Sequence, residues 1–106
     1  MRDSRWEELF VYGTLLDPRV QQRVIGRIVR GVADRLEGYV KATVDLGGSV
    51  YPIAVPDPAG TIEGMRLSLT PEELARTDEY EGPDYQRVRR RLASGRTAWV
   101  YVAPGG

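Results

Sequence analysis

The chain has 106 residues, with 15 basic and 15 acidic side chains, 42% hydrophobic residues, and neither cysteine nor histidine. This length fits one hydrophobic core, so we expect a single domain over residues 1–106, and zero net charge provides no field that would attract nucleic acid. Thiolate or imidazole metal sites, cysteine nucleophiles and Ser-His-Asp triads are excluded, which leaves carboxylates, hydroxyls, Lys41, the arginines and backbone dipoles for any catalysis.

The N-terminal residues lack the apolar segment of a secretory signal. No apolar run approaches the roughly 18 residues that a membrane-spanning helix needs. We therefore expect a cytoplasmic protein with no membrane partner. The sequence carries no oligomerisation signal, so the oligomeric state stays open.

The first predicted elements are a strand and a short helix. Residues 9–12 (LFVY) are typical of a buried strand that ends at Gly13. Asp17 is a favourable N-cap, and Pro18 suits the first position of a helix. Three aliphatic residues at helical spacing follow, and Gly26 is expected to end this helix.

The middle of the chain is predicted to be rich in strands. Residues 28–44 carry aliphatic residues between polar ones and two glycines, which fits either two strands or one bent strand. Residues 50–55 form a further predicted strand, in which Pro52 indicates an edge or a bulge. Residues 56–60 (PDPAG) are predicted to form a turn before another strand at residues 61–69.

The last third of the chain contains the clearest signals. TPEE at residues 70–73 is a capping box with proline at the first helical position, which predicts a helix over residues 71–81 that ends at Gly82. Residues 85–92 and 97–102 are predicted to form a β-hairpin around a short turn. Many short strands with only one or two helices favour the α+β class, with a strongly curved or closed sheet.

Glu81 lies in the last turn of the predicted 71–81 helix. At about 100° per residue it falls within about 20° of Leu74, on the side that faces the core. Burial and the negative end of the helix dipole would both raise the pKa of such a carboxyl, as a general base at neutral pH requires. The alternative is that Glu81 turns to water or pairs with Arg76, Arg87 or Arg89.

A second candidate is FVYGTLL at residues 10–16. The predicted strand stops at Gly13, which leaves Thr14, Leu15 and Leu16 in a tight loop before the helix. Such a loop can present backbone N–H groups to an anion. The alternative is an ordinary turn from strand to helix, in which Gly13 supplies a positive φ.

The arginine-rich stretch RVRRR at residues 87–91 has the composition of a nucleic-acid patch. On a strand, however, Arg87, Arg89 and Arg91 share one face, and no aromatic residue lies among them. A solvated face paired with acidic residues is therefore favoured, and we expect no nucleic-acid partner.

Four motifs in this order, FVYGTLL, YPIAVPDPAGTIEGMRLSLT, DEYEGPDYQR and AWVYV, resemble the gamma-glutamylcyclotransferase-like family over residues 9–102. The resemblance implies a small mixed β-barrel with flanking short helices. Members of the family need no cofactor: the α-amino group of a γ-glutamyl compound attacks its own γ-carbonyl, which forms 5-oxoproline and releases an amine. By this resemblance we expect a γ-glutamyl cyclotransferase acting on a small γ-glutamyl amine or amide.

The resemblance also implies roles for individual residues. Glu81 would be the general acid/base, and it would need neither a metal nor a cofactor. The backbone amides of the loop would hold the α-carboxylate of the substrate, and two tyrosines would form the wall of the site; the candidate substrate-binding residues are Tyr12, Gly13, Thr14, Leu15 and Tyr85. The small-molecule substrate is the expected partner.

Two residues depart from the family pattern. Thr14 stands where serine is usual and keeps a hydroxyl, whereas Arg90 stands at a strand position that is more often apolar and leaves the register of that strand open. Two other functions are also compatible with the residues. One is a binding protein that uses the same cavity for a γ-glutamyl or other carboxylate ligand without turning it over, and the other is an RNA-binding domain that uses residues 87–91.

Overall fold

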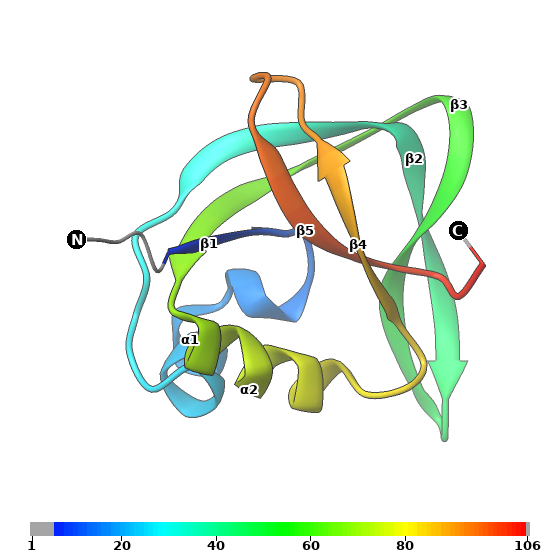
Figure 1. Cartoon of the computed structure of the whole chain (residues 1–106). Helices are drawn as coiled ribbons and strands as arrows, with labels where there is room; N and C mark the ends of the chain where they lie inside the picture. The colour runs from blue at the N-terminus through cyan, green and yellow to red at the C-terminus, as the bar shows by residue number, and fades with distance from the viewer. Residues whose placement is uncertain (1–5, 106) are drawn as a thin grey trace.

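The computed structural model describes residues 6–105, which form a mixed five-stranded sheet curled into a half-barrel with two helices on one side (Figure 1). The predicted α+β class and barrel-like sheet are therefore confirmed. The longest of the described helices has 11 residues, which is too short to cross a membrane. In chain order the elements are β1 (Glu7–Val11), the 3-10 helix η1 (Thr14–Leu16), α1 (Pro18–Val24), β2 (Val32–Leu46), β3 (Ser49–Leu69), α2 (Pro71–Glu81), β4 (Gln86–Arg91) and β5 (Thr97–Val102).

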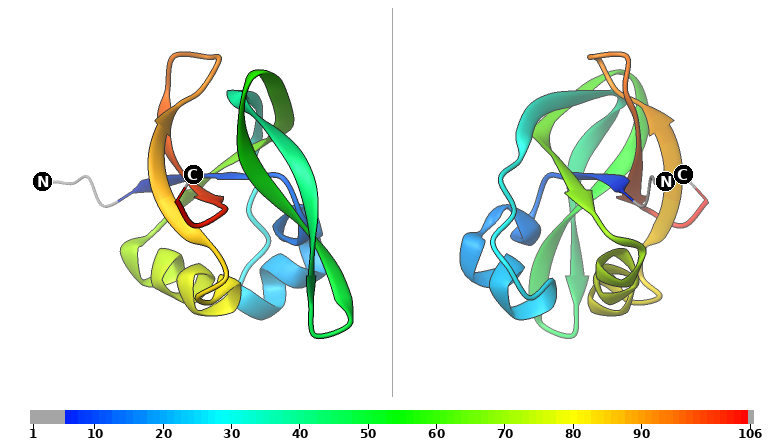
Figure 2. Two further views of the ribbon diagram at one scale, coloured as in Figure 1. Left: turned by 90° about the vertical axis from the view of Figure 1, so that its right-hand side faces the viewer. Right: turned by 60° about the vertical axis from the view of Figure 1, so that its left-hand side comes forward.

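The order of strands in the sheet is β2-β3-β1-β5-β4, and β1 and β5 run parallel. β3 is long enough to bend and pair twice. Its C-terminal part pairs with β1, while Ala54 lies opposite Val102 of β5 and accepts a hydrogen bond of 2.9 Å from the N–H of Ala103. This second contact curls the sheet. The tip of the β2–β3 hairpin thereby comes to lie on the same side as the helices (Figure 2).

Residues 28–44, predicted as two strands or one bent strand, overlap the bent strand β2, which extends to Leu46 and whose pairing with β3 shifts register between Glu37 and Tyr39. Gly38 lies at this shift with a φ of 89°, which glycine adopts without the steric cost of a Cβ. The strand begins only at Val32. Before it, the N–H of Val29 bonds to the side-chain oxygen of Gln21 at 2.9 Å, so this segment is attached to α1 and not to the sheet.

The predicted turn at residues 56–60 is wrong, because these residues lie within β3. Tyr39 is opposite Pro56 and Glu37 is opposite Thr61, so residues 57–60 bulge from β3 against the single residue between those two in β2. The chain bends there without reversing, since β2 continues as its partner on both sides of the bulge. Local turn chemistry is present, as the Asp57 carboxylate accepts the N–H of Ala59 at 2.9 Å, but long-range pairing decides the path.

α2 has the predicted bounds and caps. The Thr70 hydroxyl accepts the N–H of Glu73 at 3.1 Å, and the Glu73 carboxylate accepts the N–H of Thr70 at 2.9 Å. Gly82 ends the helix with a φ of 74° and donates its N–H to the carbonyl of Asp78 at 3.0 Å. The end of this helix is therefore well defined, which sets the position of Glu81.

The remaining predicted elements are also present. Asp17 caps α1 by accepting the N–H of Arg19 at 2.8 Å. β4 and β5 form the predicted antiparallel hairpin, closed by a hydrogen bond of 2.7 Å from the N–H of Leu92 to the carbonyl of Arg96. At Pro52, β3 pairs with β2 but not with β5, consistent with the predicted edge position.

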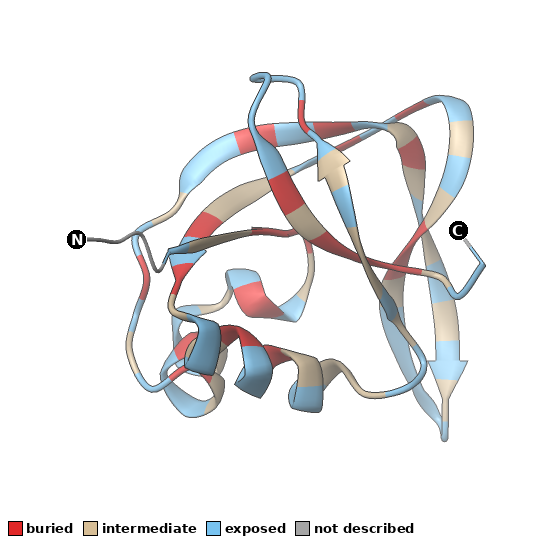
Figure 3. Cartoon of the chain, in the orientation of Figure 1, coloured by how far each residue is buried: buried red, intermediate tan, exposed pale blue. Residues whose placement is uncertain are grey.

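Both faces of β1 are buried, which positions the site between two layers of core. Phe10 and Tyr12 point into the barrel, whereas Leu9 and Val11 pack against the helices with Leu74 of α2. Buried segments recur along the strands and on the side of α2 that faces the sheet (Figure 3). The residues that directly follow Val11 are therefore held between the barrel and the helices.

Candidate functional site

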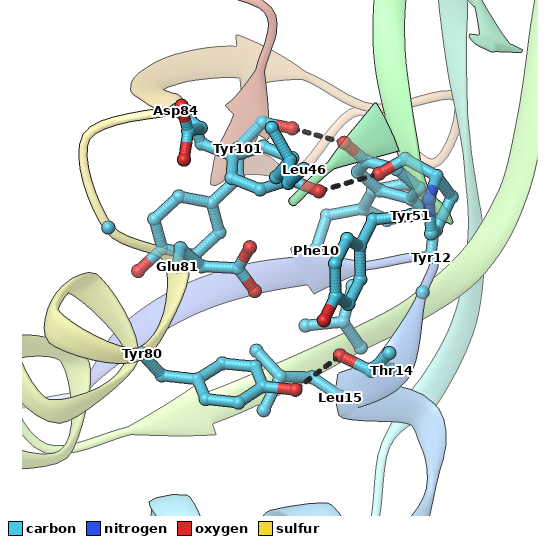
Figure 4. Close-up of a pocket in the computed structure, with 15 residues that line it drawn as sticks. Phe10, Tyr12, Thr14, Leu15, Leu46, Tyr51, Tyr80, Glu81, Asp84 and Tyr101 are labelled. Carbon is cyan, nitrogen blue, oxygen red and sulfur yellow. Dashed lines mark hydrogen bonds between the residues drawn. The ribbon is translucent and has the colours of Figure 1, made fainter. Parts of the chain in front are cut away.

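A cavity of about 370 Å³ lies where the end of α2, the η1 turn and the β2–β3 hairpin meet (Figure 4). All six residues singled out in the sequence as site candidates line it. The complete lining is Phe10, Val11, Tyr12, Gly13, Thr14, Leu15, Leu46, Tyr51, Pro52, Tyr80, Glu81, Gly82, Asp84, Tyr85 and Tyr101. Segments far apart in the sequence thus converge on one space.

The Glu81 carboxylate points from the end of α2 into this cavity (Figure 4). Burial raises the pKa of this carboxyl from 4.5 to about 7. No other described residue makes a hydrogen bond or ion pair to it, because Arg76 donates to the carbonyl of Ile25 at 2.7 Å and Arg87 pairs with Asp78 at 3.2 Å. A half-buried carboxyl that titrates near neutrality can both accept and release a proton at that pH.

The tight loop predicted after β1 is the 3-10 helix η1. Its intrahelical hydrogen bonds run from the N–H of Leu16 to the carbonyl of Gly13 and from the N–H of Asp17 to the carbonyl of Thr14, both at 3.0 Å. The N–H groups of Gly13, Thr14 and Leu15 precede the first such donor, so they have no partner within the turn. All three residues line the cavity.

Glycine is required at position 13 for packing. Its φ is −132°, so the alternative in which Gly13 supplies a positive φ is wrong. A Cβ at this position would lie 2.9 Å from Cγ of Pro52, closer than side chains normally approach. The glycine therefore lets β3 approach the loop and close this side of the cavity.

Tyr12 and Tyr85 contribute their rings to the cavity wall while their hydroxyl groups are engaged in hydrogen bonds. The Tyr12 hydroxyl donates to the carbonyl of Tyr101 and accepts the N–H of Ala54 at 3.0 Å. The Tyr85 hydroxyl donates to the carbonyl of Pro52 at 2.9 Å. Burial, followed by the charge of Glu81, raises the pKa of Tyr85 to about 12, so this hydroxyl keeps its proton at neutral pH.

Several lining residues were not predicted from the sequence. Tyr80 reaches across the cavity, where its hydroxyl lies 2.8 Å from the hydroxyl of Thr14 (Figure 4), and its position next to Glu81 was the signal that could have identified it. Leu46 and Tyr51 have no local signal. They reach the site only because β2 and β3 pair as a long hairpin whose tip lies beside the helices.

The charges of the lining are acidic. Glu81 and Asp84 are its ionisable carboxylates, and no arginine or lysine is among the lining residues that the structure describes. Within residues 6–105 no cluster of three or more Asp and Glu side chains has the spacing of a metal site. The chemistry that this lining supplies is proton transfer by Glu81, hydrogen bonding by backbone amides and hydroxyls, and contact with tyrosine rings.

Arg87 and Arg89 of β4 lie over the same aromatic ring, whereas Arg90 contacts a different one. Arg87 pairs with Asp78 and lies 4.3 Å from the centre of the Trp99 ring, and Arg89 lies 4.5 Å from the same ring. Arg90 is opposite Ala98 and donates to the Tyr39 hydroxyl at 2.9 Å, which defines the strand register that the sequence left open. Pairing with acidic residues, as expected for this face, is found at Arg87.

Comparison with known proteins places these observations in a family. The model of the family described as "Gamma-glutamyl cyclotransferase, AIG2-like" matches residues 9–106. "AIG2-like protein C" of Arabidopsis thaliana is 37% identical over 81 residues, which cover 76% of this chain and 46% of that protein. The chain therefore spans about half the length of the curated relatives it matches.

Solved structures agree at the level of the fold. A solution structure from Arabidopsis thaliana has a TM-score of 0.79 and 28% sequence identity, over 97% of this chain and 65% of that one. A solved gamma-glutamyl cyclotransferase has a TM-score of 0.78 over 92% of this chain and 66% of that one. Its sequence identity of 15% is low, so this likeness concerns the fold alone.

Proposed function

Since the chain belongs to the gamma-glutamyl cyclotransferase, AIG2-like family, we propose that it releases 5-oxoproline and an amine from a small γ-glutamyl amine or amide, with Glu81 as general acid/base. The observation that carries the proposal is the Glu81 carboxyl, which faces the cavity with no hydrogen-bond or ion-pair partner in residues 6–105 and has a pKa raised to about 7 by burial. A group with these properties can serve both proton transfers of the reaction.

The reaction begins with the Glu81 carboxylate taking a proton from the α-ammonium group of the substrate. The free amine then attacks the γ-carbonyl carbon of the same molecule and forms the new C–N bond of a five-membered ring. The bond from the γ-carbon to the leaving nitrogen breaks as the protonated Glu81 returns its proton to that nitrogen, and the ring nitrogen loses its second proton, which the released amine or solvent takes up. Nucleophile and electrophile belong to one molecule, so a bound, folded substrate lowers the barrier by several kcal/mol.

The substrate's α-carboxylate is assigned to the backbone amides of Gly13, Thr14 and Leu15. These N–H groups have no partner within η1, and they line the same cavity as Glu81. The α-amino group is attached to the same carbon as the carboxylate, so binding at η1 would hold the amine on the side of the cavity that Glu81 faces. Tyr12 and Tyr85 would provide the wall against which the substrate folds.

The charges of the lining support an amine rather than an amino acid as the leaving group. A γ-glutamyl amino acid carries a second carboxylate, which would need a cationic partner when it loses water. The described lining offers the acids Glu81 and Asp84 and no arginine or lysine for that role. A neutral or cationic amine avoids this cost.

The test is mass-spectrometric detection of 5-oxoproline after incubation with γ-glutamyl amines, γ-glutamyl amino acids and glutathione. Glu81→Gln preserves the shape of the side chain but removes the base, so it is the matched control. We expect 5-oxoproline from the wild-type protein with γ-glutamyl amines, and at least a hundredfold less from the variant. Absence of product from both proteins, with thermal stabilisation by the ligands retained, would instead establish a binding protein.

A further inference from the structure

A network of side chains next to the cavity joins the last turns of α2 to β4 and β5. The Asp78 carboxylate accepts a hydrogen bond of 2.7 Å from the Tyr101 hydroxyl and pairs with Nε of Arg87 at 3.2 Å. The Tyr101 hydroxyl is also 2.7 Å from the hydroxyl of the fully buried Thr77. Two residues of the helix are thus attached to the two strands of the β4–β5 hairpin.

Arg87 is the member of this network that comes from β4. Its guanidinium lies between the Asp78 carboxylate and the Trp99 ring, whose centre is 4.3 Å away. The side chain is 26% exposed, and its Nη1 is buried with no hydrogen-bond partner in the part of the chain that the structure describes. A planar guanidinium that lies over an aromatic ring and pairs with a carboxylate through Nε holds that carboxylate more closely than an ion pair without the ring contact does.

Asp78 and Glu81 are three residues apart on α2. Side chains at this spacing are neighbours on the same side of a helix. The backbone connects them as well, because the carbonyl of Asp78 accepts the N–H of Gly82, the residue after Glu81. Any movement of Asp78 is therefore transmitted to the helix end. In addition, an unpaired Asp78 carboxylate would be a like charge next to Glu81.

We propose that Arg87 is a positioning residue for Glu81, acting through Asp78: it holds the end of α2 against the β4–β5 hairpin and neutralises the carboxylate next to the acid/base. The catalytic consequence of this inference rests on the proposed function. Its structural part, the position and pKa of Glu81, does not. Arg87 itself does not line the cavity, so it makes no contact with a substrate bound there.

Other groups also face Glu81 and set its surroundings in every variant. They are Tyr12 directly after β1, Tyr51 of β3, Tyr80 of α2, Asp84 and Tyr85 of the connection to β4, and Tyr101 of β5. Among the charged residues of this set, Asp84 remains unchanged in the variants below. A change in the titration of Glu81 is therefore attributable to the Asp78–Arg87 pair.

The test compares Arg87→Met with Arg89→Met. Arg89 lies on the same strand and over the same Trp99 ring, at 4.5 Å, but makes no ion pair with any described residue. Both substitutions remove one positive charge and keep an unbranched side chain. They differ because only Arg87→Met removes the ion-pair partner of Asp78.

The first measurement is the pKa of Glu81, from carbon NMR of the side-chain carboxyl, assigned by its absence in Glu81→Gln. We expect Arg87→Met to raise this pKa by about 0.3 pH unit and Arg89→Met to leave it near the wild-type value. Adding Asp78→Asn to Arg87→Met removes the like charge and should bring the pKa back. An unchanged pKa in Arg87→Met, or an equal rise in Arg89→Met, would overturn the proposal.

The second measurement is 5-oxoproline formation by folded samples. Arg87→Met is expected to lower kcat about tenfold with little change in KM, because the base is misplaced while the residues that bind the carboxylate remain. If Arg87→Met does not fold, Asp78→Asn replaces it, since it keeps the shape of the side chain but removes the charge that pairs with Arg87, and a loss of kcat in the same direction is expected. A wild-type protein without activity, combined with the predicted pKa changes, would refute the proposed reaction and leave the positioning role supported.

Discussion

Glu81 is an unusual residue because three properties that normally oppose one another meet in it. It is an acidic side chain at the C-terminal end of a helix, it is half-buried, and no described residue neutralises it. A carboxylate in such a place lowers stability. The cavity that it faces gives a reason for the cost, since strained electrostatics are typical of groups that handle protons.

The raised pKa of Glu81 predicts how stability depends on pH. The folded chain binds the proton with a pKa of about 7, against 4.5 for the ordinary side chain. Between these values the folded state holds more protons than the unfolded state, so stability falls as pH rises, and the loss is complete above the folded pKa. Glu81→Gln avoids this loss and should gain up to about 3 kcal/mol relative to wild type between about pH 4 and about pH 8.

Urea unfolding of both proteins across this pH range measures the difference. Glu79→Gln replaces an exposed carboxylate in the same helix and is the matched control. The stability gain of Glu81→Gln over wild type should grow with pH more than the gain of Glu79→Gln. Equal growth for the two variants would contradict the assigned environment of Glu81.

At the scale of the element, the C-terminal end of α2 depends on Gly82. Its φ of 74° and ψ of −172° lie in a region that is essentially restricted to glycine. Apart from adjacent backbone, no atom of the described residues lies within 4 Å of where a Cβ would be, so the cost of a side chain there is conformational and not crowding by neighbouring side chains. The residue lets the chain leave the helix directly after Glu81 and turn toward β4 (Figure 1).

Gly82→Ala is therefore expected to lower the free energy of unfolding by about 1–3 kcal/mol and to reduce 5-oxoproline formation. Gly38→Ala, in β2 opposite the β3 bulge, is the control, because Gly38 has a φ of 89° and equally open surroundings. Both variants should lose stability in chemical unfolding, but only the first displaces Glu81. If Gly82→Ala and Gly38→Ala lost the same stability and kept the same activity, the catalytic position of Glu81 would not depend on the backbone conformation of Gly82.

At the scale of the whole molecule, the half-barrel is held closed where β3 meets β5. The buried Tyr12 hydroxyl lies at this junction and bonds to Tyr101 of β5 and Ala54 of β3. The same side chain contributes to the cavity wall. The stability of the barrel and the shape of the site are thus linked through one residue.

Tyr12→Phe should destabilise the fold by about 1–3 kcal/mol, because the N–H of Ala54 and the carbonyl of Tyr101 lose a buried partner. The ring remains, so we expect substrate KM to change little. Tyr80→Phe is the comparison, since it removes an exposed bond of 2.8 Å to Thr14 and should cost less. Thermal unfolding of both variants provides the test, and equal losses would argue against the junction as a point of closure.

The sequence by itself determined the elements whose signals are local. The capping box at residues 70–73, the cap at Asp17 and the hairpin near the C-terminus each depend on contacts between residues close in the chain, and all are present. The inward direction of Glu81 belongs with them, because helical periodicity relates it to Leu74. The curled α+β architecture was likewise predictable, from the number of short strands and from the family resemblance.

Only the tertiary structure decided the features that depend on pairing between distant segments. Residues 56–60 carry turn chemistry but lie in β3, because the parts of β3 on both sides of this bulge pair with β2 and carry the chain onward. The same long hairpin brings Leu46 and Tyr51 to the cavity, and Pro52 against Gly13. No local pattern encodes such contacts, because their free energy comes from surfaces that meet only when the sheet curls and buries them.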